Sequence, residues 1–60
     1  MDWQKRAYWA NLRTAYLRLA DGSYTELEIR DRLAEMGFSR FHAALVHRQL
    51  VREERIEEDS

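Results

Sequence analysis

The sequence predicts an all-α protein, a compact three-helix bundle that occupies residues 1–60 as a single domain. Two observations lead to this fold class. The chain contains no proline, and its long stretches of Ala, Leu, Arg and Glu favour helix over strand. Helical sequence is interrupted only at residues 21–23 and 37–39, where a glycine suited to a helix C-terminus precedes a serine suited to cap the next helix. We therefore expect helices over about residues 2–20, 25–36 and 39–57.

The first predicted helix, with Asp2 as its N-cap, has an aromatic-rich apolar face. The residues of this face recur at spacings of three and four, widened by two further aromatic residues: Tyr8, Leu12, Ala15, Leu19, Trp9 and Tyr16. The basic residues of the helix occupy its other faces: Lys5, Arg6, Arg13 and Arg18. We expect Trp9 and Tyr16 in the core, whereas Trp3, near the helix end, is a candidate anchor for a protein partner.

The second predicted helix begins with a capping box formed by Thr25 and Glu28, in which each side chain accepts a hydrogen bond from the backbone of the other residue. Its predicted buried line is Ile29, Leu33 and Met36, and Gly37 ends the helix. These features place the second helix in the bundle with one narrow apolar stripe facing inward.

The third predicted helix begins after Ser39 and carries more apolar surface than one face can bury. One side presents Ala43, Val46 and Leu50. At about 100° per residue, Phe41 and Leu45 lie nearly opposite that side, next to two arginines. Either the first helix covers this far side, or Phe41 and Leu45 are exposed and available to a partner.

The formal net charge of −1 conceals an uneven distribution. Residues 1–52 hold nine basic and six acidic side chains, which gives +3, whereas residues 53–60 form an acidic tail of −4. The segment from Met36 to Arg52 contains no acidic residue at all. The third helix is therefore locally basic, although the chain as a whole has no basic excess of the kind expected for a polyanion-binding protein.

Composition excludes several classes of protein. Without cysteine the chain has no disulfide, no thiol nucleophile and no Cys-type zinc site. No apolar run approaches the roughly 18 residues of a membrane span, and no signal peptide follows the first residues. We expect a soluble, cytoplasmic protein without a membrane partner.

No set of side chains suited to catalysis or metal binding is evident. His42 and His47 are five residues apart, not the four that place two imidazoles on one helix face, and no neighbouring carboxylate completes a ligand set. Ser23 and Ser39 precede helices and are expected to cap them. We therefore predict no catalytic residues, no metal, no cofactor and no small-molecule substrate.

The second half of the chain resembles a known repeat. From Thr25 it reads T-x-x-E-I-x-x-R-L-x-x-x-G-F, followed by spaced apolar residues at Ala43, Val46, Leu50 and Ile56. This pattern is similar to the three-helix repeat of the RecX family over roughly residues 16–59. The same spacing is similar to the core of helix-turn-helix and winged-helix regulators. Both resemblances imply a helix-turn-helix arrangement of the second and third helices.

The chain departs from both families in ways that affect the expected function. RecX proteins carry several repeats in tandem, and 60 residues have room for one. A winged helix needs a strand hairpin after Ile56, so we expect no wing. Glu54 stands where a glycine is usual, which favours continuation of the third helix to about Glu57.

Two functions from different classes follow. The first is a small non-enzymatic regulator or inhibitor that binds a partner protein or nucleoprotein assembly through the third helix and the aromatic first helix, with self-association as a homodimer included. The RecX resemblance favours this class, because that family acts by binding a protein assembly. Its predicted contact residues are two apolar anchors, a polar rim and one aromatic residue: Phe41, Leu45, Arg48, Arg52 and Trp3.

The alternative is a helix-turn-helix transcriptional regulator that binds DNA as a dimer. In this interpretation the third helix enters the major groove, and the first helix supplies phosphate contacts. The predicted nucleic-acid-binding residues are Arg40, His42, Arg48, Lys5, Arg6 and Arg13.

Overall fold

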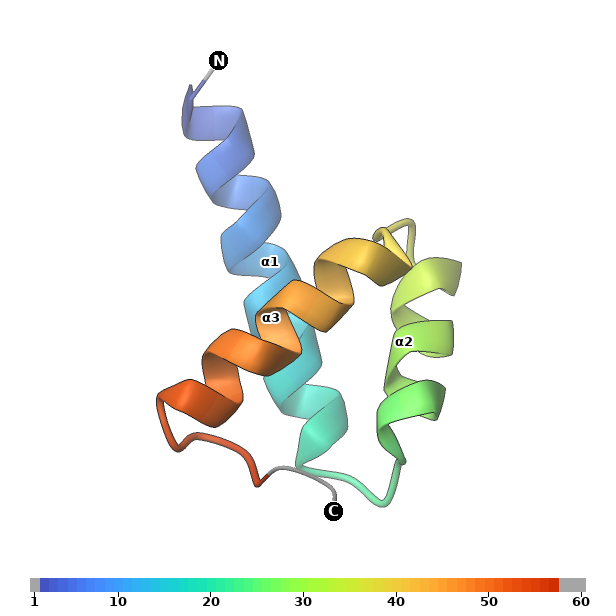
Figure 1. Ribbon diagram of the computed structural model, residues 1–60. Coiled ribbons are helices and arrows are strands. Elements are labelled where there is room, and N and C mark those ends of the chain that lie inside the picture. Colours follow the sequence, from blue (N-terminus) through green and yellow to red (C-terminus); the bar gives the residue numbers. More distant parts are fainter. Residues whose placement is uncertain (1, 58–60) are drawn as a thin grey trace.

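The protein is an all-α three-helix bundle, as predicted (Figure 1). The computed structural model describes the backbone of residues 2–57 and the side chains of residues 5–57. Helix α1 spans Asp2–Ala20, α2 spans Glu26–Glu35 and α3 spans Arg40–Arg52, and no strand occurs between residues 2 and 57. Asp2 is already the first residue of α1 and not its N-cap.

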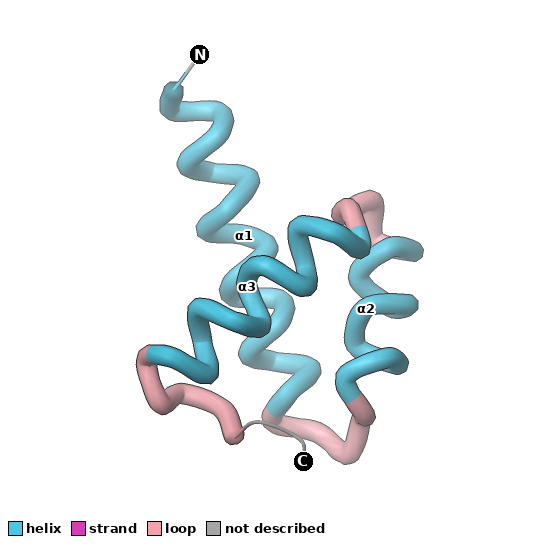
Figure 2. The backbone as a smooth tube through the Cα atoms, viewed as in Figure 1, coloured by secondary structure: helices cyan, strands magenta, loops and turns pink. Residues whose placement is uncertain are grey.

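The three helices pack around a common centre, and each contacts the other two. Helix α3 crosses in front of α1, while α2 stands beside them and connects to α3 through a tight turn (Figures 1 and 2). The N-terminal part of α1 extends beyond the other two helices, so the molecule is elongated, with principal extents of 37 × 25 × 17 Å. Lys5 and Arg6 belong to the N-terminal part of α1.

A single core holds the helices together. All three helices supply its buried residues: Leu12, Tyr16, Ile29, Leu33, Ala43, Val46 and Leu50. Half-buried side chains pack around it, including Trp9, Phe38 and Ile56. The stripes predicted for α1 and α3 therefore face inward, as their spacing requires.

The predicted N-caps Thr25 of α2 and Ser39 of α3 are confirmed, whereas Ser23, also expected to cap a helix, lies in the turn two residues before the N-cap of α2. Thr25 is the N-cap of α2, where its hydroxyl accepts from the Glu28 N–H at 3.2 Å, and the Glu28 carboxylate accepts from the Thr25 N–H at 2.9 Å. The bond from the Thr25 N–H is the largest cause that lowers the pKa of the Glu28 carboxyl. Ser39 is the N-cap of α3 and accepts from the His42 N–H. Two side chains chosen from the sequence thus satisfy backbone donors that the helix geometry leaves unpaired.

The end of α2 corrects one prediction. Gly37 has a φ of 100°, and the Phe38 N–H donates to the Leu33 carbonyl at 2.9 Å while the Gly37 N–H donates to the Ala34 carbonyl at 3.0 Å. This is a Schellman motif, which turns the chain sharply after the helix. Met36 is therefore the C-cap and is 60% exposed, not the third residue of the buried line. Phe38, after the turn, packs against the core instead.

The end of α3 corrects a second prediction. The helix stops at Arg52 and does not continue to Glu57, because Glu54 adopts a left-handed conformation with a φ of 61°. The Arg55 N–H donates to the Leu50 carbonyl at 2.9 Å and the Glu54 N–H to the Val51 carbonyl at 3.0 Å, which is the same Schellman motif. The turn brings Ile56 back onto the core. Of the predicted acidic tail, residues 58–60 lie outside the described part of the chain.

Candidate protein-docking site

The outward side of α3 carries a stripe of apolar and cationic residues. Because Ala43, Val46 and Leu50 are buried, the residues on the opposite side of the helix face away from the bundle. We define the α3 outer face as Phe41, Leu45, Arg48 and Arg52, which are spaced by four, three and four residues. Phe41 is 70% exposed and Leu45 is half-buried, so α1 does not cover this side of α3 completely.

A groove runs along this face where α1 approaches α3. It has a volume of about 420 Å³ and is lined by Trp9 of α1 together with Leu45, Arg48, Gln49 and Arg52 of α3. On the other side of the Arg48–Arg52 ridge lies a smaller hollow of about 270 Å³, bordered by Val51 and His47. Trp9 and Gln49 were not among the predicted site residues. As predicted, the half-buried Trp9 ring packs against the core, and it also forms a wall of the groove.

The arginines of the molecule fall into two groups. Arg40 pairs with Asp31 at 3.0 Å, and Arg13 forms a two-pronged contact with the Glu53 carboxylate, with one bond at 3.2 Å. The hydrogen bond from Arg13 lowers the pKa of the Glu53 carboxyl below its ordinary value and is the largest cause of that shift. Arg48 and Arg52, by contrast, are exposed and make no ion pair within residues 5–57. Their charges are available to an external carboxylate or phosphate.

His42 joins α3 to α1 and does not project from the surface. Its Nδ1 atom lies 2.7 Å from the Tyr8 hydroxyl, and the Ser39 N–H donates to the same hydroxyl oxygen at 3.3 Å. The His42 ring also packs against Trp9, with ring centroids 4.8 Å apart. The imidazole is thus held between two aromatic rings of α1, where the Trp9 ring leads directly into the groove.

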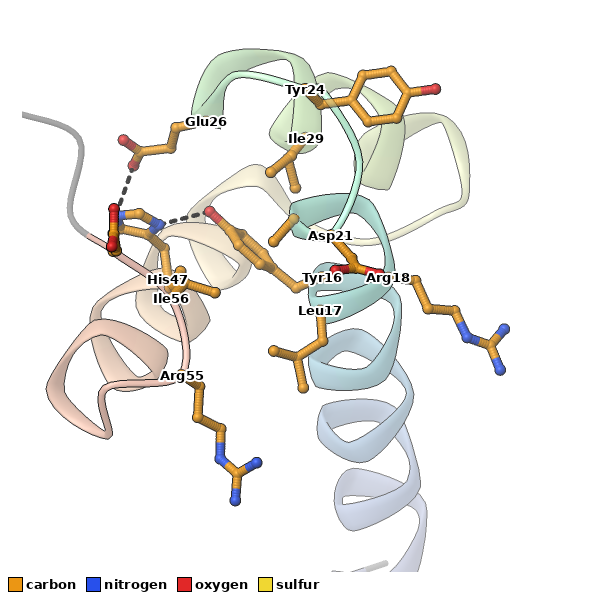
Figure 3. Close-up of a pocket in the computed structure, with 12 residues that line it drawn as sticks. Tyr16, Leu17, Arg18, Asp21, Tyr24, Glu26, Ile29, His47, Arg55 and Ile56 are labelled. Atoms are coloured by element: carbon orange, nitrogen blue, oxygen red, sulfur yellow. Dashed lines mark hydrogen bonds and ion pairs between the residues drawn. The ribbon is translucent and has the colours of Figure 1, made fainter.

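His47 makes a parallel connection five residues later. Its Nδ1 atom lies 2.6 Å from the hydroxyl of Tyr16, which is buried, and its Nε2 atom lies 3.6 Å from the Glu26 carboxylate of α2 (Figure 3). Glu26 in turn pairs with Arg30. This chain of polar side chains therefore links all three helices at one end of the core.

The same polar chain borders a cavity of about 590 Å³ near the C-terminal end of α1 (Figure 3). Apolar walls are supplied by Leu17, Ile29 and Ile56. Both ring nitrogens of His47 already face groups of the protein, so neither is directed at this cavity as an unpaired donor or acceptor. Within the described residues, no group of three or more His, Asp or Glu side chains is placed to hold a metal ion.

The predicted nucleic-acid-binding residues do not gather on one surface. Arg48 lies on the α3 outer face, whereas the exposed Lys5 and Arg6 lie near the N-terminal end of α1. The other three are engaged within the molecule: Arg13 with Glu53, Arg40 with Asp31 and His42 with Tyr8. The side chain of Trp3, predicted as a partner contact, is outside the described residues.

The comparisons with known proteins give no further guidance. No protein-family model, curated protein or solved structure matches this chain. In the described part of the chain, each helix is too short or too polar to cross a lipid bilayer.

Proposed function

We propose that this protein is a small non-enzymatic regulator that docks on a partner protein or nucleoprotein assembly through the α3 outer face and the adjoining edge of α1. The single observation that carries the proposal is the 70% exposure of Phe41 on a helix face that contains no acidic residue. A large aromatic side chain left in water next to unpaired arginines has the composition of a protein-binding hot spot.

The groove between α1 and the α3 outer face supports the same function. Trp9 and Leu45 offer an apolar wall, and Arg48 and Arg52 border it with unpaired positive charge. Protein interfaces place apolar anchors at the centre and charged groups at the rim. The surface therefore suits a partner segment that presents an apolar side chain flanked by carboxylates. The resemblance to the RecX repeat supports a role in binding a protein assembly.

DNA binding by a helix-turn-helix dimer is the second candidate, and one observation favours it. Helix α3 follows α2 through a tight turn and exposes Arg48 and Arg52, as a recognition helix would. The central position of Phe41 and Leu45 disfavours it, because base edges are read by polar side chains. The internal pairing of Arg13, Arg40 and His42 further reduces the positive charge available to phosphates.

Affinity capture with matched charge variants tests the proposal. The double variant Phe41→Asp, Arg48→Glu should lose a partner that the wild-type chain retains. Arg18→Glu, which reverses an exposed arginine on α1, is the control and should retain it. Circular dichroism of all variants should show unchanged helicity, because the substituted side chains are exposed. Retention of the partner by the folded double variant contradicts the proposed docking surface.

A salt titration with a fluorescent DNA duplex separates the two functions. We expect no binding even at about 50 mM salt if the chain is a protein-docking module. Affinity that falls steeply with salt, and is lost with Arg48→Glu but not with Phe41→Asp, supports the DNA-binding alternative instead.

A further inference from the structure

We propose that the α3 outer face binds the outward side of α2 in a second copy of the same chain, so that the protein forms a reciprocal homodimer. This inference rests on the docking role proposed above and names a partner for that surface. It follows from the properties of α2, which complement those of α3 in charge and in apolar content.

The outward side of α2 is an acidic face with one apolar residue. Ile29 and Leu33 are buried, and the residues two positions before or after them point the opposite way. We define the α2 outer face as Leu27, Asp31 and Glu35, which are exposed and spaced by four residues. It carries carboxylates where the α3 outer face carries guanidinium groups.

Each face also has a single prominent apolar anchor. Leu27 on α2 and Phe41 on α3 are both 70% exposed, the highest values among the exposed large apolar residues that the structure describes. An apolar side chain of this size is more stable when it is covered. Pairing the two faces covers both anchors at once and brings Arg48 and Arg52 toward the carboxylates of α2.

A symmetric dimer makes this pairing twice. The two outer faces lie on neighbouring helices, and the Arg40–Asp31 ion pair at 3.0 Å joins those helices within the chain. A two-fold axis between α2 and α3, lying in the plane of contact, places α2 of each copy on α3 of the other. Both complementary contacts form together and the assembly closes at two copies, whereas a head-to-tail arrangement of the same faces would form a larger ring or a filament.

The expected interface is small. It consists of one face each of a 10-residue and a 13-residue helix, which is at the low end of specific interfaces. We therefore expect a weak, concentration-dependent dimer, measured by sedimentation from about 10 µM to 1 mM. A wild-type chain that stays monomeric over this whole range overturns the inference.

Charge exchange between the two faces gives the sharpest test. In the first variant, Arg48→Glu with Arg52→Glu, the α3 outer face becomes acidic. In the second, Asp31→Lys with Glu35→Lys, the α2 outer face becomes basic while the Thr25 capping box stays intact. Each variant alone should dimerise at least about tenfold more weakly than wild type, because like charges then meet at both contacts.

Mixing the two variants should restore dimerisation. In the mixed dimer, acidic α3 meets basic α2 at one contact and the native pairing remains at the other. Circular dichroism of each variant must show wild-type helicity. Two folded variants that stay monomeric when mixed overturn the reciprocal arrangement, as does a wild-type dimer that neither variant weakens.

The experiments distinguish failure of the homodimer from failure of the proposed docking function. A monomeric wild-type chain that still captures another protein, and loses it with Phe41→Asp, Arg48→Glu, overturns the homodimer but leaves the docking function standing. Dimerisation that depends on both faces, without capture of any other protein, supports the homodimer and removes the regulatory role.

Discussion

Helices α2 and α3 end in the same hydrogen-bonding motif, built once around a glycine and once around a glutamate. Gly37 takes a φ of 100° after α2, and Glu54 takes a φ of 61° after α3. Glycine adopts such a conformation without steric cost, whereas a residue with a Cβ atom loses roughly 1–2 kcal/mol. The second turn must therefore be supported by contacts that the first does not need.

Residues before and after Glu54 in the sequence make those supporting contacts. Arg13 of α1 binds the carboxylate of Glu53, and Ile56 returns to the core. Both come from outside the turn itself. The difference between the two helix ends shows that one is specified locally by its glycine and the other by tertiary structure. After this turn, residues 54–57 no longer follow the α3 axis.

The largest loss of stability is expected from substituting the two core leucines that belong to the helix-end motifs. The first carbonyl of each motif belongs to a fully buried leucine, Leu33 or Leu50. Replacing either by alanine should destabilise the protein by about 3 kcal/mol, through lost burial and a cavity. Total stability for a chain this size is about 3–9 kcal/mol, so urea denaturation should show a large shift or complete unfolding. A shift at only one of the two leucines contradicts their equivalence.

Substitution of Gly37, at the end of α2, should give the next largest loss of stability. Gly37→Ala should destabilise the fold by about 1–2 kcal/mol, measured by thermal or urea denaturation. No atom lies within 4 Å of the added Cβ, so the loss reflects backbone conformation and not a clash. Gly22→Ala is a matched control, because no positive φ is recorded there and the nearest neighbour atoms are 3.4 Å away. Equal losses at the two glycines remove the conformational explanation.

The opposite change at the end of α3 should stabilise the protein. Glu54→Gly removes the steric cost of the left-handed conformation, and we expect a gain of about 0.5–1 kcal/mol after the added freedom of the unfolded chain is deducted. Glu57→Gly, at an exposed position outside the motif, should give no such gain. A loss of stability with Glu54→Gly shows that the glutamate side chain itself contributes to the turn.

The smallest effect concerns the contact between Arg13 and Glu53, and it depends on pH. Since the pKa of the Glu53 carboxyl is lowered in the folded state, its contribution is present above the ordinary value of 4.5 and is lost as the pH falls through the lowered value. Glu53→Gln should therefore be less stable than wild type at pH 7, and the difference should shrink as the pH falls below 4.5. A difference that persists in acid contradicts a charge-dependent contact.

Three helix ends are predictable from single residues, whereas the caps expected at Asp2 and Ser23 are wrong. Thr25 and Ser39 were identified as caps because their side chains satisfy nearby backbone donors, and Gly37 marked a helix end by its own conformational freedom. Met36 was assigned to the buried line by spacing alone, and the turn at Gly37 gives that place to Phe38. Glu54 gave no local signal of a helix end.

The candidate site was predictable only in part. The spacing of Phe41, Leu45, Arg48 and Arg52 places them on one helix face, and Phe41 is indeed exposed. Which arginines are unpaired depends instead on contacts across the bundle, such as the pairing of Arg13 with a residue 40 positions later. The groove wall formed by Trp9 likewise depends on how α1 crosses α3, which no short pattern records.

The Tyr8–His42 and Tyr16–His47 hydrogen bonds fix the position of α1 along its own axis relative to α3. Tyr8 and Tyr16 are separated by about 12 Å along α1, whereas their partners His42 and His47 are separated by about 7.5 Å along α3. Sliding α1 along its axis by one turn breaks both bonds. Because the two separations differ, the two tyrosines cannot both form such bonds with the two histidines in a shifted position. Leucine and alanine side chains tolerate such sliding far better than paired polar groups do. The two bonds therefore select one longitudinal position of α1, which sets how far its end projects and holds Trp9 beside the groove.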